Sequence, residues 1–152
     1  MSVKVPPRGT KGLRLPHFLA LLGNRMMLRS FRRGGARTQG GIETLLLETV
    51  GAKSGQARQA VLGFLPDGDG AWLVIASLAG AARNPAWLHN LAAQPDATVH
   101  FEDGTRVEVH AETLEGADLA AAWQRLETEA PEYPKYLGKT DREMAIVRLR
   151  RR

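Results

Sequence analysis

The sequence predicts a mainly β fold with flanking helices (α+β), in which six antiparallel strands close into a small barrel. After residue 41, short apolar runs of strand length follow one another along the chain. Asp-Gly pairs in the connections supply the positive-φ residues that tight hairpin turns need. Strand follows strand too directly for a βαβ chain, and closing the sheet removes exposed strand edges. A small barrel is therefore the expected architecture.

Residues 1–41 are expected to form a basic N-terminal arm with an amphipathic helix, and residues 42–152 the barrel domain. The first 14 residues are rich in Pro, Gly and basic side chains, which predicts a flexible or loosely docked stretch. Over 16–31 apolar residues recur at helical spacing among arginines. A glycine-rich link then separates this arm from the domain.

The expected strands are 42–50, 59–65, 71–77, 97–102, 105–114 and 143–150. Two helices are expected among them. Asn84 can cap the first helix, Pro85 suits its first turn, and Pro95 ends it. The second runs over 116–128 with its apolar residues on one face.

The composition narrows the class of protein. The chain has 152 residues, no cysteine and a net charge of +5. The missing thiols exclude disulfides, thiolate catalysis and Cys-ligated metal sites. The longest uncharged run of the arm is too short for a transmembrane helix, so we expect a cytoplasmic protein. Arginines gather near both ends of the chain, which favours anionic partners.

The most informative motif is the glycine-bracketed basic turn at 51–58. Its glycines let successive N–H groups converge, while Lys53, Ser54 and Arg58 add charge and a hydroxyl, which is typical of an anion-binding turn. A plain hairpin with solvated charges is the alternative. A Walker A loop is excluded, because Ala52 stands where that motif needs glycine before the lysine.

Two further segments carry candidate site residues. In the run 84–90, Trp87 is expected to pack in the core, while the amide of Asn90 offers a donor and an acceptor to a ligand or to the helix end. Tyr133 and Tyr136 lie in a proline-punctuated segment that predicts a surface loop or a pocket lid. No metal site, hydrolytic motif or nucleic-acid platform is expected from the histidines, serines and basic residues.

Taken in order, these motifs resemble the deazaflavin-dependent nitroreductase family. The resemblance runs from about residue 42 to 149 and rests on the turn at 51–58, Ala76-Ser77, the run 84–91 and the segment from Tyr133 through Thr140-Asp141-Arg142-Glu143. It implies the split β-barrel related to FMN-binding flavoproteins. It also implies that residues 42–152 bind the deazaflavin coenzyme F-420, which donates hydride to quinones, nitro-compounds or other planar acceptors.

The resemblance assigns roles to particular positions. Lys53, Ser54, Gly55 and Arg58 would bind the phosphate and polyglutamate tail of the coenzyme, and Ser77, Trp87 and Asn90 would hold its ring. Tyr133, Tyr136 and Leu88 would contact the acceptor. No side chain need act as acid or base, since the coenzyme carries the chemistry.

Two positions depart from the family pattern. Leu78 stands where many members have a polar or basic residue, so one coenzyme contact is expected to be either lost or taken over by Arg83, and Leu88 replaces an aromatic residue of the acceptor pocket. Three alternatives stay open: an FMN-binding reductase, a non-catalytic F-420 carrier, and peripheral contact of the arm with the inner face of the cell membrane. A monomer or a homodimer is expected.

Overall fold

The computed structural model describes residues 2–34 and 42–152. Its strands are β1 (Thr44–Val50), β2 (Ala57–Pro66), β3 (Ala71–Ile75), β4 (Asp96–His100), β5 (Arg106–Thr113) and β6 (Ile146–Arg151). Its helices are α1 (His17–Arg32), α2 (Ala86–Ala93), α3 (Gly116–Glu129) and α4 (Glu132–Leu137), with one 3-10 turn, η1 (Leu78–Gly80). All six expected strands are confirmed, with ends that differ by a few residues.

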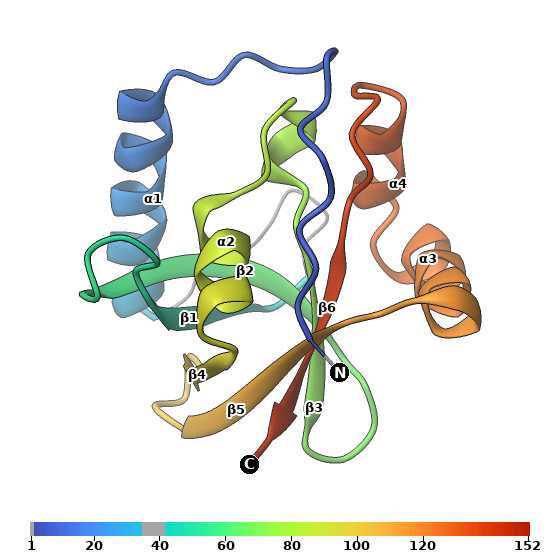
Figure 1. Ribbon diagram of the computed structural model, residues 1–152. Helices are drawn as coiled ribbons and strands as arrows, with labels where there is room; N and C mark the ends of the chain where they lie inside the picture. The colour runs from blue at the N-terminus through green and yellow to red at the C-terminus, as the bar shows by residue number, and fades with distance from the viewer. Residues whose placement is uncertain (1, 35–41) are drawn as a thin grey trace.

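The strands form a closed antiparallel barrel in the order β1-β2-β3-β6-β5-β4, and β4 returns to pair with β1 (Figure 1). Strands that follow one another in the sequence pair directly, except β3 and β4. β3 pairs instead with β6, which lies between β3 and β5. This arrangement confirms the predicted fold class. It also leaves no free sheet edge among the described strands, which is the physical reason for closure.

The barrel is filled by aliphatic side chains that point inward from successive strands. Leu45, Leu47, Val74, Val99 and Val109 are all fully buried. β5 shows the alternation most clearly, since every second residue from Val107 to Thr113 is buried. One buried and one solvated face is the expected pattern for a barrel strand.

A second apolar cluster lies outside the barrel, beneath α3 and α4. It joins Leu126 of α3 and Tyr133 of α4 to buried residues of β2, β3 and β6. The helix α4 was not expected, because its segment carries Pro131 and Pro134. Both prolines fall at or within the first turn of the helix, where backbone N–H groups have no intrahelical partner to lose.

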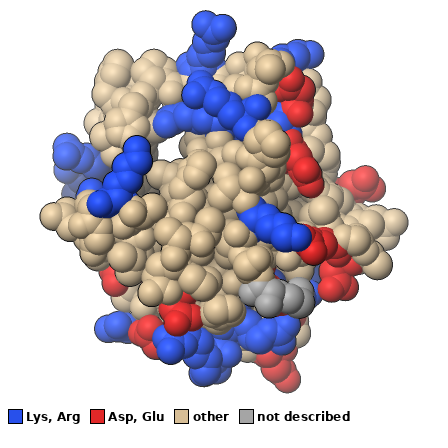
Figure 2. Space-filling view, viewed as in Figure 1, with Lys and Arg blue, Asp and Glu red and all other residues tan. Residues whose placement is uncertain are grey.

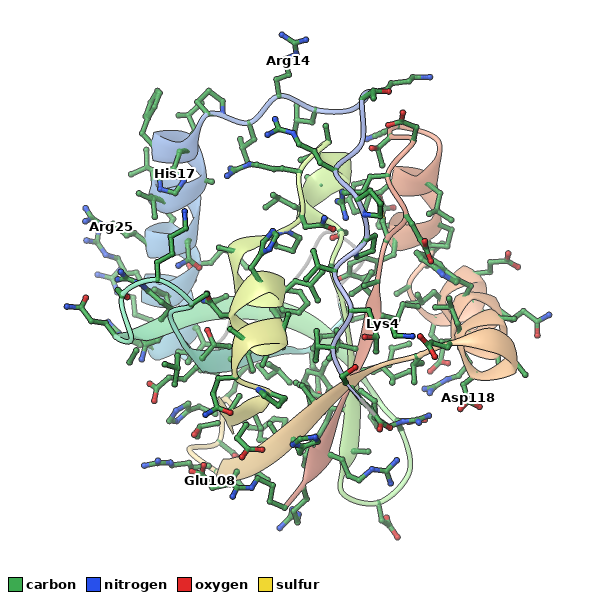
Figure 3. The ribbon with its side chains drawn as sticks, viewed as in Figure 1. Lys4, Arg14, His17, Arg25, Glu108 and Asp118 are labelled. Atoms are coloured by element: carbon green, nitrogen blue, oxygen red, sulfur yellow. The ribbon has the colours of Figure 1, made fainter. Side chains whose placement is uncertain are left out.

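The first residues of the chain are docked more tightly than the sequence analysis expected. The backbone N–H of Gly9 donates to the Ala82 carbonyl at 2.8 Å, and that of Leu13 to the Gly80 carbonyl at 3.1 Å. The buried side chain of Val3 joins the core, and Lys4 points toward the start of α3, where it pairs with Glu115 (Figure 3). The arm thus runs down the front of the barrel between α2 and β6 (Figure 1).

The helix α1 lies against β2 and β1 but is held by few residues. Phe31 packs on Leu46, with Met27 and Leu28 alongside, while most other apolar side chains of α1 face outward. Within residues 2–34 and 42–152, no helix combines the length and the apolar character needed to cross a bilayer.

Candidate functional site

The turn between β1 and β2 is closed by its glycines and leaves its charges in solvent. The N–H of Gly51 donates to the Gln56 carbonyl at 2.8 Å, and that of Gly55, at φ +69°, to the Gly51 carbonyl at 2.9 Å. A Cβ on Gly51 would lie 2.6 Å from Ser54 Oγ, so a larger residue there would push the Ser54 hydroxyl out of its present position. Lys53, Ser54, Gly55 and Arg58 are all exposed, as an anion-binding turn requires.

Within the turn, Ser54 and Arg58 are already oriented toward each other. Arg58 Nη2 donates to Ser54 Oγ at 3.3 Å, and the Gln56 N–H donates to the same oxygen at 3.2 Å. These contacts bring the guanidinium and the hydroxyl to one side of the turn. An anion bound there would receive charge from Arg58 and from Lys53.

Asn90 of α2 attaches this turn to the helix. Its Oδ1 accepts from the Ala52 N–H at 3.0 Å, and its Nδ2 donates to Thr49 Oγ1 at 3.1 Å. The amide is buried, so these bonds form away from water. The sequence analysis expected Asn90 to hold a ligand ring. In the structure, its amide holds the basic turn beside α2.

A strained loop follows β3 at the residues expected to line the coenzyme ring. After Ser77, three consecutive residues have positive φ: Leu78 at 41°, Ala79 at 53° and Gly80 at 80°. For Leu and Ala this conformation costs roughly 1–2 kcal/mol each, so surrounding contacts must hold it. Strain of this kind gathers at binding sites.

Arg142, four residues before the start of β6, holds this loop through hydrogen bonds from its side chain. Its guanidinium donates to the carbonyls of Ala81 (2.9 Å), Ala76 (2.9 Å) and Ser77 (2.8 Å) and to Asn84 Oδ1 (3.2 Å). Only 3% of the residue is exposed, and burial lowers its pKa from the ordinary value. The sequence analysis named this arginine only as part of a motif, since nothing in a sequence separates a buried arginine from a surface one.

Asn84 belongs to the same cluster and does not cap α2. The N-cap is Pro85, while Asn84 accepts from Arg142 and donates from Nδ2 to the Pro6 carbonyl at 2.8 Å. The expected cap was therefore wrong. Both polar atoms of this buried amide are therefore used in contacts with distant parts of the chain, and neither caps the helix.

Arg83 follows the strained loop by three residues and is a further candidate contact. Its Nη2 donates to the Leu15 carbonyl at 3.3 Å, but its buried Nε has no partner. Buried donors of a guanidinium are seldom left unpaired. This orphaned N–H is therefore available to an acceptor on a bound molecule.

Several residues assigned to ligand contacts are instead packed in the core. Leu88 is 0% exposed, and the Trp87 side chain is buried in the same barrel cluster. Neither faces an open site. The contact of Leu88 with an acceptor has no support in this geometry, because α2 turns that position into the barrel.

The two tyrosines lie on α4 at the other side of the strained loop. Tyr133 is 8% exposed within the outer apolar cluster, and burial raises its pKa to about 12. Tyr136 is half-buried, packs edge-to-face on Tyr133 at 6.1 Å, and has Lys139 Nζ at 5.3 Å from its ring centre. Only Tyr136 has an appreciable exposed surface for an acceptor.

The face that carries these groups is hollowed between α1 and the part of the molecule that holds α2, and Lys and Arg side chains surround the hollow (Figure 2). Two other cavities of about 290 Å³ each lie near the end of α1 and the β4–β5 turn, and no predicted site residue lines them. Among residues 2–34 and 42–152, no group of three or more His, Asp or Glu could hold a metal ion.

The sequence of this chain also matches a known protein family. Residues 24–150 match the family model described as F-420H(2)-dependent quinone reductase. An F-420H(2)-dependent quinone reductase of Mycobacterium tuberculosis is 39% identical over 123 residues, which cover 79% of this chain and 81% of that protein.

Solved structures agree with the fold. A chain described as an F-420-H2 dependent reductase (FDR-A) is 29% identical, covers 70% of this chain and 92% of its own, and superimposes with a TM-score of 0.61. A chain described as a domain-swapped dimer is 26% identical, covers 86% of this chain and 98% of its own, and gives a TM-score of 0.62.

Proposed function

The chain belongs to the F-420H(2)-dependent quinone reductase family, and we propose that it transfers a hydride from reduced coenzyme F-420 to a quinone or another planar organic acceptor. It is thus an oxidoreductase whose cofactor is the deazaflavin coenzyme. The observation that carries this proposal is an exposed basic turn, bonded to Asn90 of α2, together with a strained loop that precedes α2 in the chain.

The residues present suit such a coenzyme. Its tail is an anion, and Lys53, Ser54 and Arg58 form an exposed cationic turn with one hydroxyl. The unpaired Nε of Arg83 offers a further buried donor near the loop that would meet the ring. We assign the tail to the turn and the ring to Ser77 and its neighbours.

When bound, the coenzyme supplies the hydride chemistry. The chain's own residues bind and orient it. Asn90 holds the basic turn at a fixed place on α2, and Arg142 holds the loop at Ser77. Tyr136, half-buried at the edge of α4, is positioned to contact the acceptor and limit water. No side chain is assigned a proton transfer.

Equilibrium titration tests the cofactor. Purified protein is titrated with oxidised F-420 and, separately, with FMN, and binding is followed by cofactor fluorescence. We expect saturable binding of F-420 and none of FMN in the same concentration range. Saturable binding of FMN alone would contradict the proposal and favour an FMN-dependent reductase.

Turnover tests the reaction. Reduced F-420 is mixed with enzyme and menadione, and reoxidation of the coenzyme is followed by absorbance. Tight coenzyme binding without turnover across a panel of quinones and nitroaromatics would identify a carrier protein instead of an enzyme. Light scattering of the same preparation distinguishes a monomer from a homodimer.

We also propose that α1 rests on an anionic membrane surface. Phe18, Leu22 and Met26 are 68%, 53% and 65% exposed on one side of the helix. Arginines lie among them, and Arg25 points outward from α1, away from α2 (Figure 3). Apolar side chains flanked by arginines suit the boundary between acyl chains and anionic headgroups.

Co-sedimentation with vesicles tests this contact. We expect binding to vesicles that contain phosphatidylglycerol, weaker binding to pure phosphatidylcholine, and loss of binding in the variant Phe18→Ser/Leu22→Ser. Leu137→Ser is the matched control, since Leu137 is 44% exposed on α4. Equal sedimentation of all variants would contradict the role of α1.

A further inference from the structure

We propose that Arg142 is a positioning residue of the coenzyme site, which fixes the loop at 77–81 in its strained shape and leaves an uncompensated positive charge behind it. This inference rests on the proposed function, because it assigns to the loop the coenzyme ring. It goes beyond that function by naming a residue that touches neither the basic turn nor the acceptor face.

The side chain of Arg142 joins the two sides of the loop at 77–81. The guanidinium bonds the carbonyls of Ala76 and Ser77 on one side of the loop and the Ala81 carbonyl on the other. The positive-φ residues Leu78, Ala79 and Gly80 lie between these fixed points. A planar fork with five donors can join acceptors that lie this close together, whereas a lysine ammonium offers one nitrogen.

Arg142 also brings a positive charge to the loop. Every acceptor of Arg142 is a carbonyl or amide oxygen, and among the ion pairs of residues 2–34 and 42–152 none involves it. The neighbouring Asp141 is turned away and accepts from Thr10 and from the Lys11 N–H at 2.9 Å. A guanidinium stays protonated in proteins, so its charge adds to that of Arg83 beside the loop.

Arg142 would act on a bound ligand through the backbone of the loop, without touching the ligand itself. No peptide bond within residues 2–34 and 42–152 is cis, so each carbonyl held by Arg142 directs the N–H of the next residue to the opposite side. The N–H groups of Ser77 and Leu78 are thereby turned away from the guanidinium. Releasing the two carbonyls would let both peptides rotate.

The arm makes this burial possible. Thr140 Oγ1 donates to the Lys11 carbonyl at 2.6 Å and accepts from the Arg142 N–H at 3.0 Å. Gly12 passes so close to the loop that a Cβ there would lie 2.7 Å from the Gly80 carbonyl oxygen. The arm therefore closes over Arg142 and shields its hydrogen bonds from water.

The test compares Arg142→Lys with Arg148→Lys. Arg148 is a partly buried arginine of β6 held by Asp67 and Glu112, so its variant controls for loss of stability. The readouts are the dissociation constant for oxidised F-420 by fluorescence titration and the melting temperature. We expect Arg142→Lys to raise the dissociation constant at least about tenfold and Arg148→Lys less than about twofold, although both lower the melting temperature.

Hydrogen exchange supplies a second measurement, since a merely structural role would not confine the change to one loop. We expect faster exchange at 77–81 in Arg142→Lys, while β1 and the turn at 51–58 exchange as in the wild type. An unchanged dissociation constant in Arg142→Lys, or an equal rise in both variants, would overturn the proposal.

If Arg142→Lys does not fold, Asn84→Ala replaces it, because it removes one of the four acceptors of the guanidinium. We expect a rise of about threefold in the dissociation constant, and no rise would overturn the proposal. Failure of the wild-type protein to bind F-420 would instead refute the proposed function, so the two failures are distinguishable.

Discussion

Two buried or partly buried arginines, one beside η1 and one beside the β2–β3 turn at the opposite end of the molecule (Figure 1), have opposite kinds of partner. Arg148, near the β2–β3 turn, pairs with Asp67 at 2.6 Å and with Glu112 at 3.4 Å. Arg142, before the start of β6, bonds only carbonyl and amide oxygens. Burial opposes the charge of both, but the carboxylates raise the pKa of Arg148, whereas the pKa of Arg142 is lowered.

This difference shows where the protein keeps positive charge available. Around Arg148, acidic residues neutralise the basic ones, and Figure 2 shows blue and red side chains intermixed at the lower end of the molecule. Around Arg142, the described ion pairs supply no counter-ion. An anionic coenzyme would meet the unpaired charge of Arg142, whereas the charge of Arg148 is balanced by carboxylates. The predictions below separate the two ends by stability and by binding.

The largest effect on stability is expected for Leu88→Ala, which tests whether Leu88 is a core residue of the barrel or a contact of the acceptor. Leu88 is 0% exposed within the barrel cluster, so truncation should lower the free energy of unfolding by about 2–5 kcal/mol. Urea denaturation measures this. Leu22→Ala, at a 53% exposed position of α1, is the control and should cost under about 0.5 kcal/mol. A similarly small loss in Leu88→Ala would return that residue to the acceptor pocket.

The next effect is on binding. Arg58→Ala should weaken F-420 binding by about tenfold to a hundredfold, because a charge-assisted contact to phosphate contributes roughly 1.5–3 kcal/mol. The loss should shrink as salt rises, since the site is exposed. Arg106→Ala, an exposed arginine of β5, is the matched control. An unchanged dissociation constant for Arg58→Ala would remove this residue from the site.

A smaller effect is expected at the opposite end. Asp67→Asn removes the charge that holds Arg148 Nε at 2.6 Å, and it should lower the free energy of unfolding by about 1–2 kcal/mol. The dissociation constant for F-420 should not change. Asp69→Asn, an exposed position in the same turn, controls for the lost charge alone. Altered coenzyme binding in Asp67→Asn would show that the two ends are coupled.

The smallest effect at neutral pH concerns Tyr133. Its pKa of about 12 lies above the unfolded value of roughly 10, so the folded state binds its proton more tightly. This contribution to stability is complete below pH ~10 and is lost as the pH rises toward 12. With only two tyrosines in the chain, ultraviolet titration of the wild type and of Tyr133→Phe resolves this ring. A transition of Tyr133 near pH 10 in the folded protein would support the lid that the sequence analysis considered.

The strands could be predicted because their signals are local. Alternating apolar residues and the Asp-Gly turns define β2 to β5 without knowledge of their neighbours. The helix α4 could not, since Pro134 reads as a helix breaker unless one knows that the helix begins two residues earlier. The same holds for Asn84, whose partners Arg142 and Pro6 lie 58 and 78 residues away.

The chain's composition and local patterns by themselves determined the barrel and the exposed basic turn at 51–58, because spacing and glycines are properties of neighbouring residues. Tertiary structure alone decided which polar side chains form hydrogen bonds within the protein. Asn90 and Arg142 offer the same hydrogen bonds in any chain, and only burial beside particular carbonyls and amides directs them to position the loops. Lys53 and Arg58 stay exposed and the Nε of Arg83 has no partner, so we assign these groups to the ligand.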